Sequence, residues 1–463
     1  MQVCSTVAPR LSLRALLPEA EILGTDDLRV GRCVSDWREV EAGDLFAALG
    51  GDRGQHGAGI PEAVARGAAA VVCQKAPADR DVPLCLVPNA RDAYGRICQA
   101  LAGNPSQQLK VIGIAGANGK TTTSCLVTSV LLQAGGRVGL LGSLGYLDGQ
   151  AIEPAAHPTP PADRLAALLA RMVANGCSHA VVEVTRRSLA ESRMAGVRLD
   201  VACITAARGD RLFDYLAPEG FAVLNADDPA AAACLRKLDG PALTVGIDRQ
   251  AEIMGTLLEQ CPSEQMFLLT AGSETVPVRT RMIGTPHVYH CLTAAAVGLA
   301  YGIDLLAVVR GLEAVEYVPG RLERIECGQP FGVFVDAART PAALAACLQM
   351  LRKVTAGRLM CVFKVRGDRR LSPRPTGPRL GQVLETAADQ TVLTSDHLPG
   401  EDLRQAVAQV LDDFRQPQNV RVIADRAAAV RWAMAEAQPG DCVLLAGQAD
   451  DGQIARQWLY QRD

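Results

Sequence analysis

The chain has 463 residues, of which 49% are hydrophobic and 21% are charged, so it has enough apolar surface for several folded domains, which excludes wholesale disorder. Its 47 basic and 50 acidic side chains give a formal net charge of -3 without a dense run of Lys or Arg, which argues against nucleic acid as a partner. No run of about 18 apolar residues occurs, so no membrane span is expected.

Cysteine usage and the first residues bear on the compartment. The fifteen cysteines include no Cys-x-x-Cys pair and sit mostly in apolar runs, which indicates buried thiols in a reducing compartment. Arg10, Arg14 and two prolines interrupt the apolar residues near the start, unlike the apolar segment of a signal peptide. We therefore expect a cytoplasmic protein.

The first two parts of the chain are separated by a polar break. Residues 1–105 mix short apolar stretches with glycine-containing turns, which predicts a small α/β domain. After the break at 103–106, apolar strands such as 111–115 and 180–184 alternate with helical patterns such as 162–176, which predicts a mostly parallel sheet.

Two later features complete the predicted organisation. Alternating polarity at 266–270 and 276–282 predicts a hairpin. A turn signal at 318–320 then precedes renewed α/β alternation to the end of the chain. We predict an α/β fold with domain boundaries after residues 105 and 318.

A phosphate-binding loop is the strongest local signal. Residues 113–123 read Gly-Ile-Ala-Gly-Ala-Asn-Gly-Lys-Thr-Thr-Thr, between a predicted strand and a helix that extends to about Gln133. In a P-loop, glycines let backbone N–H groups face a triphosphate, Lys120 reaches the β- and γ-phosphate oxygens, and the Thr121 hydroxyl binds Mg²⁺. A chance glycine turn before a helix is the alternative, and the agreement of all these positions argues against it. ATP and Mg²⁺ are the predicted cofactors, with nucleotide contacts from Gly116, Asn118, Gly119, Lys120, Thr121 and Thr122.

The P-loop spacing Gly-x-x-Gly-x-Asn-Gly-Lys-Thr resembles that of the Mur ligases and the related folylpolyglutamate synthetases. The resemblance extends over nearly the whole chain, and within the family it is closest to the ligase that adds the third amino acid to UDP-N-acetylmuramoyl-L-alanyl-D-glutamate. It implies three domains: a small UDP-substrate-type α/β domain at 1–105, a central P-loop parallel sheet at 106–318 and a Rossmann-like α/β domain at 319–463. The matching segments are Gly43-Asp44-Leu45-Phe46, Glu183-Val184, Asn225-Ala226-Asp227-Asp228-Pro229, Gly320-Arg321-Leu322-Glu323 and Leu444-Leu445-Ala446-Gly447.

The resemblance also implies a reaction. ATP phosphorylates a substrate carboxylate, and an amine then displaces phosphate, usually with two Mg²⁺ ions neutralising charge. The first ion is implied to bind Thr121 and Glu183, the latter at the end of a predicted strand, where a merely solvated carboxylate is the alternative. Lys120 and Glu183 are the implied catalytic residues, and Arg321 and Asp336 of the third domain are implied to contact ATP.

Several residues that this chemistry needs are replaced. Arg211 stands where the family has a His that ligates the second Mg²⁺, and a guanidinium cannot ligate a cation. No Lys occurs between Arg211 and Lys237, so the family's carbamylated lysine is missing. The other altered segments are Asp36-Trp37-Arg38 for Asp-Ser-Arg, Thr185-Arg186-Arg187 for Ser-Ser-His, Pro286-His287-Val288-Tyr289-His290 for Phe-Asn-x-x-Asn, Asp336-Ala337-Ala338-Arg339 for Asp-Tyr-Ala-His, Asp396-His397-Leu398-Pro399 for Asp-Asn-Pro-Arg and Gly447-Gln448-Ala449-Asp450-Asp451 for Gly-Lys-Gly-His-Glu.

Two of these replacements leave alternatives open. His287 and His290, three positions apart on a predicted helix, are either a metal pair or buried structural side chains, and we favour the latter because no third ligand is identifiable. Arg211 either stabilises phosphoryl charge in place of the missing cation or pairs with carboxylates at a surface no longer used.

Two hypotheses for function follow. One is an ATP-binding Mur ligase homologue tied to peptidoglycan precursor synthesis, with weakened or lost ligase activity and a protein partner if it is inactive. The other is an active ATP-dependent acid–amino-acid ligase that acts on UDP-N-acetylmuramoyl-dipeptide or another small acid. We favour the first because the second-metal ligands are missing. A P-loop GTPase or transport ATPase fits least, since no switch or Walker-B segment can be placed.

Overall fold

The computed structural model describes residues 10–50, 59–78, 81–206, 209–236, 238–365, 379–394, 400–448 and 450–460. The chain divides into two compact units, residues 1–253 with 293–308 and residues 254–292 with 309–463. The chain passes between the units at the start of β16 (Ile253–Gln260) and within helices α8 (Thr285–Ala300) and α9 (Leu305–Glu313). The domain boundaries predicted after residues 105 and 318 therefore stay a prediction.

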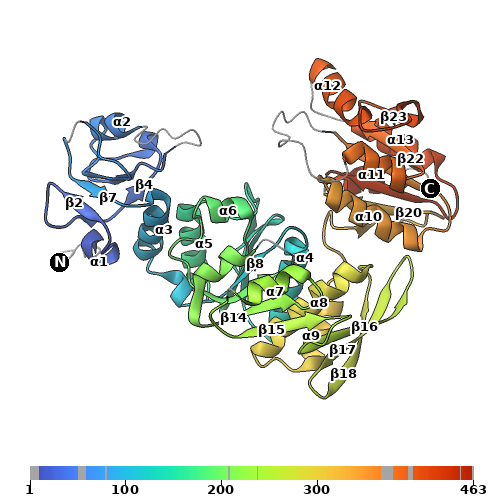
Figure 1. The fold of residues 1–463 in the computed structure, drawn as a ribbon, viewed down its shortest axis with the longest axis horizontal. Helices are drawn as coiled ribbons and strands as arrows, with labels where there is room; N and C mark the ends of the chain where they lie inside the picture. Colours follow the sequence, from blue (N-terminus) through green and yellow to red (C-terminus); the bar gives the residue numbers. More distant parts are fainter. Residues whose placement is uncertain are drawn as a thin grey trace, which may run out of the picture. The chain divides into compact units, whose positions relative to one another are not determined.

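The first unit begins with a small α/β region (Figure 1). Its five-stranded sheet has the order β2-β7-β6-β5-β4, parallel except for β2. Alternate strand residues face opposite sides of this sheet, as the two-residue period of a strand requires. One side packs with α3 and includes Leu45, Ala47 and Val72. The other side packs with α2 and includes Phe46, Val71 and Cys73. The elements are β1 (Leu11–Ser12), α1 (Leu13–Leu16), β2 (Glu21–Leu23), β3 (Arg29–Val30), β4 (Cys33–Val34), η1 (Trp37–Glu39), β5 (Leu45–Ala47), α2 (Ile60–Ala65), β6 (Ala70–Cys73), β7 (Leu84–Leu86), α3 (Ala90–Leu101) and η2 (Pro105–Gln107).

A larger parallel sheet follows in the same unit, with β9, β12, β8, β13, β14 and β15 side by side and the antiparallel strands β10 and β11 beyond β9. The predicted helix at 162–176 and strands at 111–115 and 180–184 are confirmed by α5, β8 and β12. The elements are β8 (Lys110–Ala115), α4 (Lys120–Gln133), β9 (Val138–Gly142), β10 (Gly145–Leu147), β11 (Ile152–Glu153), α5 (Ala162–Ala174), β12 (His179–Glu183), α6 (Arg186–Ala190), β13 (Leu199–Ile204), η3 (Asp210–Tyr215), β14 (Leu216–Asn225), α7 (Pro229–Leu235) and β15 (Ala242–Gly246).

The second unit contains a hairpin and a doubly wound sheet. β16 (Ile253–Gln260) precedes the antiparallel pair β17 (Gln265–Ala271) and β18 (Glu274–Thr280), which confirms the predicted hairpin. The six-stranded sheet has the order β19-β20-β24-β21-β22-β23, with only β19 antiparallel. Its elements are β19 (Glu323–Arg324), β20 (Gly332–Asp336), α10 (Pro341–Val354), β21 (Leu359–Lys364), α11 (Leu380–Ala387), β22 (Gln390–Thr394), α12 (Gly400–Leu411), η4 (Pro417–Asn419), β23 (Val420–Val422), α13 (Arg426–Glu436), β24 (Cys442–Ala446) and α14 (Asp451–Tyr460).

Alternate residues of the six-stranded sheet face two helical layers. Cys361 and Phe363 of β21 pack in a core with residues of α10, α11 and α12, whereas Met360 and Val362 pack with residues of α13 and α14. A parallel strand covered on both faces reads as a continuous apolar run, which explains the sequence Leu-Met-Cys-Val-Phe. The α/β fold class, with a Rossmann-like C-terminal sheet, is confirmed.

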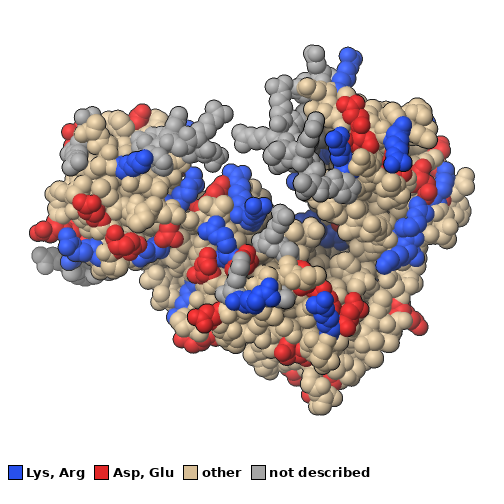
Figure 2. Space-filling view, viewed as in Figure 1, with Lys and Arg blue, Asp and Glu red and all other residues tan. Residues whose placement is uncertain are grey.

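Two further observations concern the charge of the surface and the hydropathy of the helices. On the face shown in Figure 2, acidic and basic side chains are interspersed. Among the described residues, no helix is both long enough and apolar enough to cross a membrane.

Candidate nucleotide and metal site

The P-loop connects β8 to α4 at the carboxyl end of the central sheet. Gly116 and Gly119 have φ angles of 141° and 84°, which favour glycine, and a Cβ at Gly116 would lie 2.3 Å from Thr205 Oγ1. Gly119 is the N-cap of α4 and provides no side-chain cap, so the first-turn N–H groups can face a phosphate. The loop therefore has the backbone conformation that its sequence predicts.

Lys120 and Asn118 lie on this loop. The Lys120 ammonium donates to the backbone oxygen of Gly116 at 2.8 Å. The backbone oxygen of Asn118 accepts a hydrogen bond from the Thr205 hydroxyl at 2.5 Å, which ties the loop to the end of β13. Thr122 is buried in the first turn of α4. Their predicted contacts with nucleotide stay predictions.

Thr121 and Glu183 meet at the end of β12. The Thr121 hydroxyl donates to Glu183 Oε2 at 3.2 Å, and Glu183 is only 1% exposed. β8 and β12 are neighbours in parallel register, with Glu183 beside Ile114, so the strand that enters the P-loop brings Thr121 to this carboxylate. Glu183 is therefore a buried, hydrogen-bonded carboxylate, and not the solvated strand-end carboxylate that was the alternative interpretation.

A third residue, Ser143, completes this cluster and was missed by the sequence analysis. Its backbone N–H donates to Glu183 Oε1 at 2.9 Å and its hydroxyl donates to Glu183 Oε2 at 3.0 Å. Gly142, which ends β9, lies so close that a Cβ there would be 2.3 Å from Glu183 Oε1. The signal in the sequence was a Gly-Ser pair directly after an apolar strand, but its neighbour in the sheet could not be inferred locally.

These oxygens are suitable ligands for Mg²⁺. Mg²⁺ binds one or two carboxylates together with hydroxyl, water and phosphate oxygens, and the cluster offers one carboxylate and two hydroxyls at the start of the P-loop helix. No group of three His, Cys, Asp or Glu side chains that could hold a metal occurs within the described ranges. The donor set therefore fits a cation that also binds nucleotide phosphate.

Arg211 lies on η3, which follows β13 at the same edge of the sheet. Its side chain is exposed, while the neighbouring Leu212 is fully buried. Burial raises the pKa of Tyr215 on the same element, and the positive charge of Arg211 opposes this rise. Arg211 thus places a positive charge at the surface, and its correspondence to the family's second-metal ligand stays a prediction.

Arg187 is the second residue of α6, two residues after the N-cap Thr185. It is exposed and donates to Glu191 Oε1 at 2.7 Å, and the other oxygen of Glu191 lies 2.6 Å from Arg193 Nη2. Arg193 also donates to the backbone oxygen of Thr159 at 2.7 Å. Glu191 is therefore an ion-pair partner that the sequence analysis did not name.

Arg321 and Asp336 lie together in the second unit. The Asp336 carboxylate accepts backbone hydrogen bonds from Leu322 at 2.8 Å and from Ala338 at 2.7 Å, and burial raises its pKa. Leu322 has a φ of 46°, which is unfavourable for a side chain, so Asp336 stabilises the turn that carries Arg321. Their contact with ATP stays a prediction. Of the altered segments, residues Asp396–Pro399 and Ala449 lie outside the described residues.

His287 is buried and His290 is partly buried near the start of α8, and burial lowers the pKa values of the two imidazoles to about 3 and about 4. The His287 Nε2 atom lies 3.2 Å from Thr280 Oγ1 and 3.3 Å from Cys291 Sγ. The two rings are edge-on, with centroids 6.3 Å apart. The lowered pKa values favour neutral imidazoles, and no third metal ligand joins the two rings among the described residues, which agrees with the structural interpretation that we favoured.

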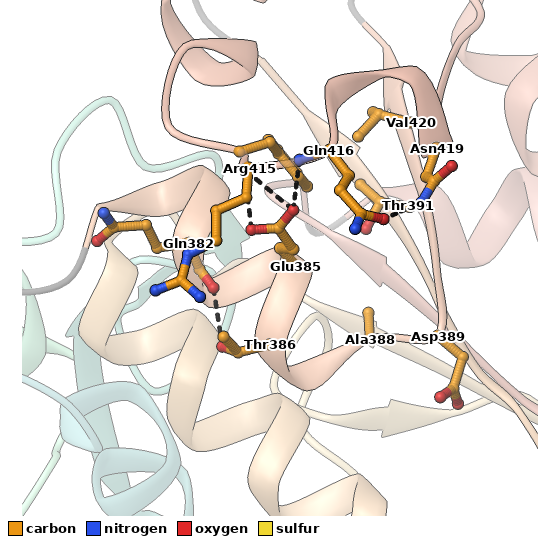
Figure 3. Close-up of a pocket in the computed structure, with 11 residues that line it drawn as sticks. Gln382, Glu385, Thr386, Ala388, Asp389, Thr391, Arg415, Gln416, Asn419 and Val420 are labelled. Carbon is orange, nitrogen blue, oxygen red and sulfur yellow. Dashed lines mark hydrogen bonds between the residues drawn. The ribbon is translucent and has the colours of Figure 1, made fainter.

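A pocket of about 660 Å³ lies elsewhere, on the C-terminal sheet, and contains none of the predicted site residues (Figure 3). Glu385, on its wall, accepts hydrogen bonds from the backbone N–H groups of Arg415 and Gln416. Asn419 donates to the Gln416 side chain. These polar groups support the loop before β23, and we assign the pocket no part in the chemistry.

Comparison with known proteins decides the family. The Mur ligase middle domain matches residues 114–298, and the Mur ligase glutamate ligase domain matches residues 320–449. The UDP-N-acetylmuramoyl-L-alanyl-D-glutamate–2,6-diaminopimelate ligase of Geobacillus kaustophilus is 33% identical, over 90% of this chain and 89% of the relative. The chain belongs to the Mur ligase family.

Solved structures agree with the fold of this Mur ligase. A UDP-N-acetylmuramoyl-L-alanyl-D-glutamate–2,6-diaminopimelate ligase superimposes with a TM-score of 0.69 at 23% identity, over 98% of this chain and 99% of that one. The MurF ligase of Thermotoga maritima, solved in complex with ADP, superimposes with a TM-score of 0.60 at 17% identity, over 93% and 98% of the two chains.

Proposed function

We propose that this Mur ligase binds Mg-ATP at residues 116–122 and is tied to peptidoglycan precursor synthesis in the cytoplasm, as a homologue of the UDP-N-acetylmuramyl-tripeptide synthetases. We further propose that it ligates an amino acid to UDP-N-acetylmuramoyl-L-alanyl-D-glutamate weakly or not at all. The observation that carries this proposal is the assembled Thr121–Glu183 cluster, set against Arg211, which stands where the resemblance implies a metal ligand.

The intact half supports nucleotide binding. Lys120 and the N–H groups of the first turn of α4 would bind the phosphates, and Thr121 and Glu183 would hold Mg²⁺. When bound, Mg²⁺ neutralises the charge of the phosphoryl group during its transfer. The Asp336-supported turn would present Arg321 to the same nucleotide.

The altered half supports weak ligation. The substrate carboxylate and the phosphoryl oxygens repel one another, and the family relieves this repulsion with a second cation. The guanidinium of Arg211 carries charge but cannot bridge two ligands as a metal ion does. A homologue without turnover would act through a protein partner.

An active ligase is the second candidate. It is supported by 33% identity to a named diaminopimelate ligase over 90% of the chain and by the assembled Thr121–Glu183 cluster. In this case Arg211 supplies the missing charge, and the acceptor is UDP-N-acetylmuramoyl-dipeptide or another small acid.

One set of measurements on the full chain separates these proposals. Mg-ADP should raise the melting temperature, because a ligand at a hundred times its Kd stabilises the native state by about 2.7 kcal/mol. Lys120→Ala should abolish the rise, whereas Lys110→Ala, at the other end of β8, should keep it. An unchanged melting temperature in the unaltered chain would contradict nucleotide binding.

ADP release then measures ligation. The chain is incubated with Mg-ATP, UDP-N-acetylmuramoyl-L-alanyl-D-glutamate and a panel of amino acids. Release that requires both the dipeptide and one amino acid would establish the active ligase, whereas its absence in a chain that binds Mg-ADP would support the weakened homologue.

A further inference from the structure

The pocket shown in Figure 3 lies at the amino ends of parallel strands of the C-terminal sheet. Thr391 and Val420 line it at the starts of β22 and β23, whereas Asp336 ends β20 and Gly447 follows β24 at the opposite edge. Open sheets of this kind bind their substrates beyond the carboxyl ends of the strands. The pocket is therefore separate from the predicted nucleotide contacts, and its volume of about 660 Å³ suits a small organic ligand.

The two carboxylates of the pocket are already held by other groups of the protein. Glu385 accepts backbone hydrogen bonds at 3.0 and 2.8 Å from two successive residues of the loop before β23. Asp389 accepts the backbone N–H of Leu359 at 2.7 Å and forms an ion pair with Arg352. Both negative charges are thus compensated within the protein.

The guanidinium of Arg415 is the charge of the pocket that remains available. Among the described residues, no carboxylate pairs with it and no group accepts its side-chain N–H donors, since only its backbone N–H bonds Glu385. Figure 3 shows its side chain extending toward the face of α11 that carries Gln382 and Thr386. A guanidinium binds a carboxylate or a phosphate through two parallel hydrogen bonds. The pocket therefore offers a positive charge to a ligand.

Side-chain amides on two walls of the pocket add uncharged donors. Gln382 Oε1 accepts the backbone N–H of Arg379 at 3.0 Å. Gln416 Oε1 accepts a hydrogen bond from Asn419 Nδ2 at 2.8 Å. Each glutamine uses its oxygen in these contacts, which leaves its NH₂ group as a donor. This set of donors favours a ligand that carries several oxygens.

The rest of the lining is apolar. Ala388, Phe414 and Val420 line the pocket, and all three are partly buried against the core that contains α10, α11 and α12. Their remaining exposed surface can cover an apolar group of a ligand, which the hydrophobic effect favours.

We propose that this pocket binds a small organic anion, whose carboxylate or phosphate pairs with Arg415 and whose apolar body packs against Phe414. The donors, the available charge and the apolar wall all belong to residues 382–420 of one sheet and its helices. The proposal is independent of ligase activity, because none of these residues belongs to the predicted nucleotide or metal site.

The test uses simple probes on the full chain. Isothermal titration calorimetry measures the binding of phenyl phosphate and of benzoate, which distinguish a phosphate from a carboxylate, and of inorganic phosphate and acetate, which lack the apolar body. At least one aromatic probe should bind about tenfold more tightly than its small counterpart, the low end of the effect of burying an apolar side chain.

Variants then locate the site. Arg415→Gln should weaken binding of the aromatic probe about tenfold or more, because a hydrogen-bonded charge is lost. Arg431→Gln is the matched control, since Arg431 is also exposed but lies on α13, which covers the other face of the sheet. Thr386→Glu should also weaken binding, because its carboxylate competes for the guanidinium of Arg415, whereas Thr386→Gln should not.

A phosphate probe could instead bind at the P-loop, so Lys120→Ala is measured as well and should bind the probe like the unaltered chain. Loss of binding in Lys120→Ala but not in Arg415→Gln would place the probe at the P-loop and overturn the proposal. The proposal also fails if neither aromatic probe binds at millimolar concentration, if the small anions bind equally well, or if Arg415→Gln and Arg431→Gln have equal effects. Melting temperatures without ligand show whether each variant is folded, and Thr386→Glu keeps the test valid if Arg415→Gln is not.

Discussion

Gly142 and Glu183 approach so closely on neighbouring parallel strands that a Cβ at position 142 would lie 2.3 Å from the Glu183 carboxylate. Real side chains do not reach such distances, so the carboxylate occupies its place because residue 142 lacks a side chain. The predicted metal site thus depends on a glycine outside the P-loop.

Gly142→Ala should therefore displace Glu183. We expect at least a tenfold rise in the Mg²⁺ needed for ADP binding, together with a loss of about 1–3 kcal/mol in unfolding free energy from overpacking. Gly240→Ala is the matched control, because its Cβ would have no neighbour closer than 3.9 Å. Equal Mg²⁺ dependence in both variants would count against the close approach.

A buried ion pair stabilises the C-terminal sheet. Arg426 is 2% exposed and pairs with Asp451, and its guanidinium also donates to the backbone oxygens of Val362 at 3.1 Å and Ala446 at 3.3 Å. Removal of one partner from such a pair leaves a buried charge and costs about 3–5 kcal/mol. We expect this loss for Asp451→Leu in urea unfolding, and a smaller loss for Asp451→Leu combined with Arg426→Met than the two single losses together. Additive losses would show that the two residues act independently.

Stability should fall as the pH falls from 7 to 5. His287 and His290 have folded pKa values of about 3 and about 4, below the ordinary value of 6.5, because burial disfavours their charged forms. Below pH 6.5 these two histidines therefore bind protons in the unfolded chain but not in the folded chain. Their contribution to the free energy of unfolding is complete above pH 6.5 and is lost as the pH falls below it. Each histidine contributes up to about 1.4 kcal/mol per pH unit within the window.

Melting temperatures between pH 5 and 7 measure this dependence. Replacement of both histidines by Asn, the family residue at these positions, should flatten the curve. His179 also has a pKa lowered by burial, so it is left in place and the residual slope reports its contribution. An unchanged slope in the double variant would show that His287 and His290 become protonated without unfolding.

Ligation should be slow. We expect turnover with UDP-N-acetylmuramoyl-L-alanyl-D-glutamate to be absent or orders of magnitude below about 10 per second, the middle of the range for enzymes, because the proposed function leaves the second cation without its ligands. If ADP release is efficient and disappears in Arg211→Ala while ADP binding persists, Arg211 supplies the missing charge. Efficient release that survives Arg211→Ala would contradict both explanations.

The sequence by itself determined the features that depend on neighbouring residues. The P-loop at 113–121 was readable because glycine, lysine and threonine act at fixed spacing between a strand and a helix, and α5 was readable from its apolar period. The apolar run at 180–184 likewise placed Glu183 at the end of a strand, which β12 confirms.

Only the tertiary structure decided which strand ends share a site. Ser143 joins Glu183 from 40 residues away because β9 and β12 pair in parallel, and Asp451 is buried because α13 presents Arg426 to it. Side-chain type and spacing do not encode such partners, since the pairing of distant strands and helices is selected by packing of the whole sheet and not by any single segment. For the same reason, the sequence identified residues 447–451 only as an altered motif. The structure shows that Asp451 of this segment pairs with Arg426.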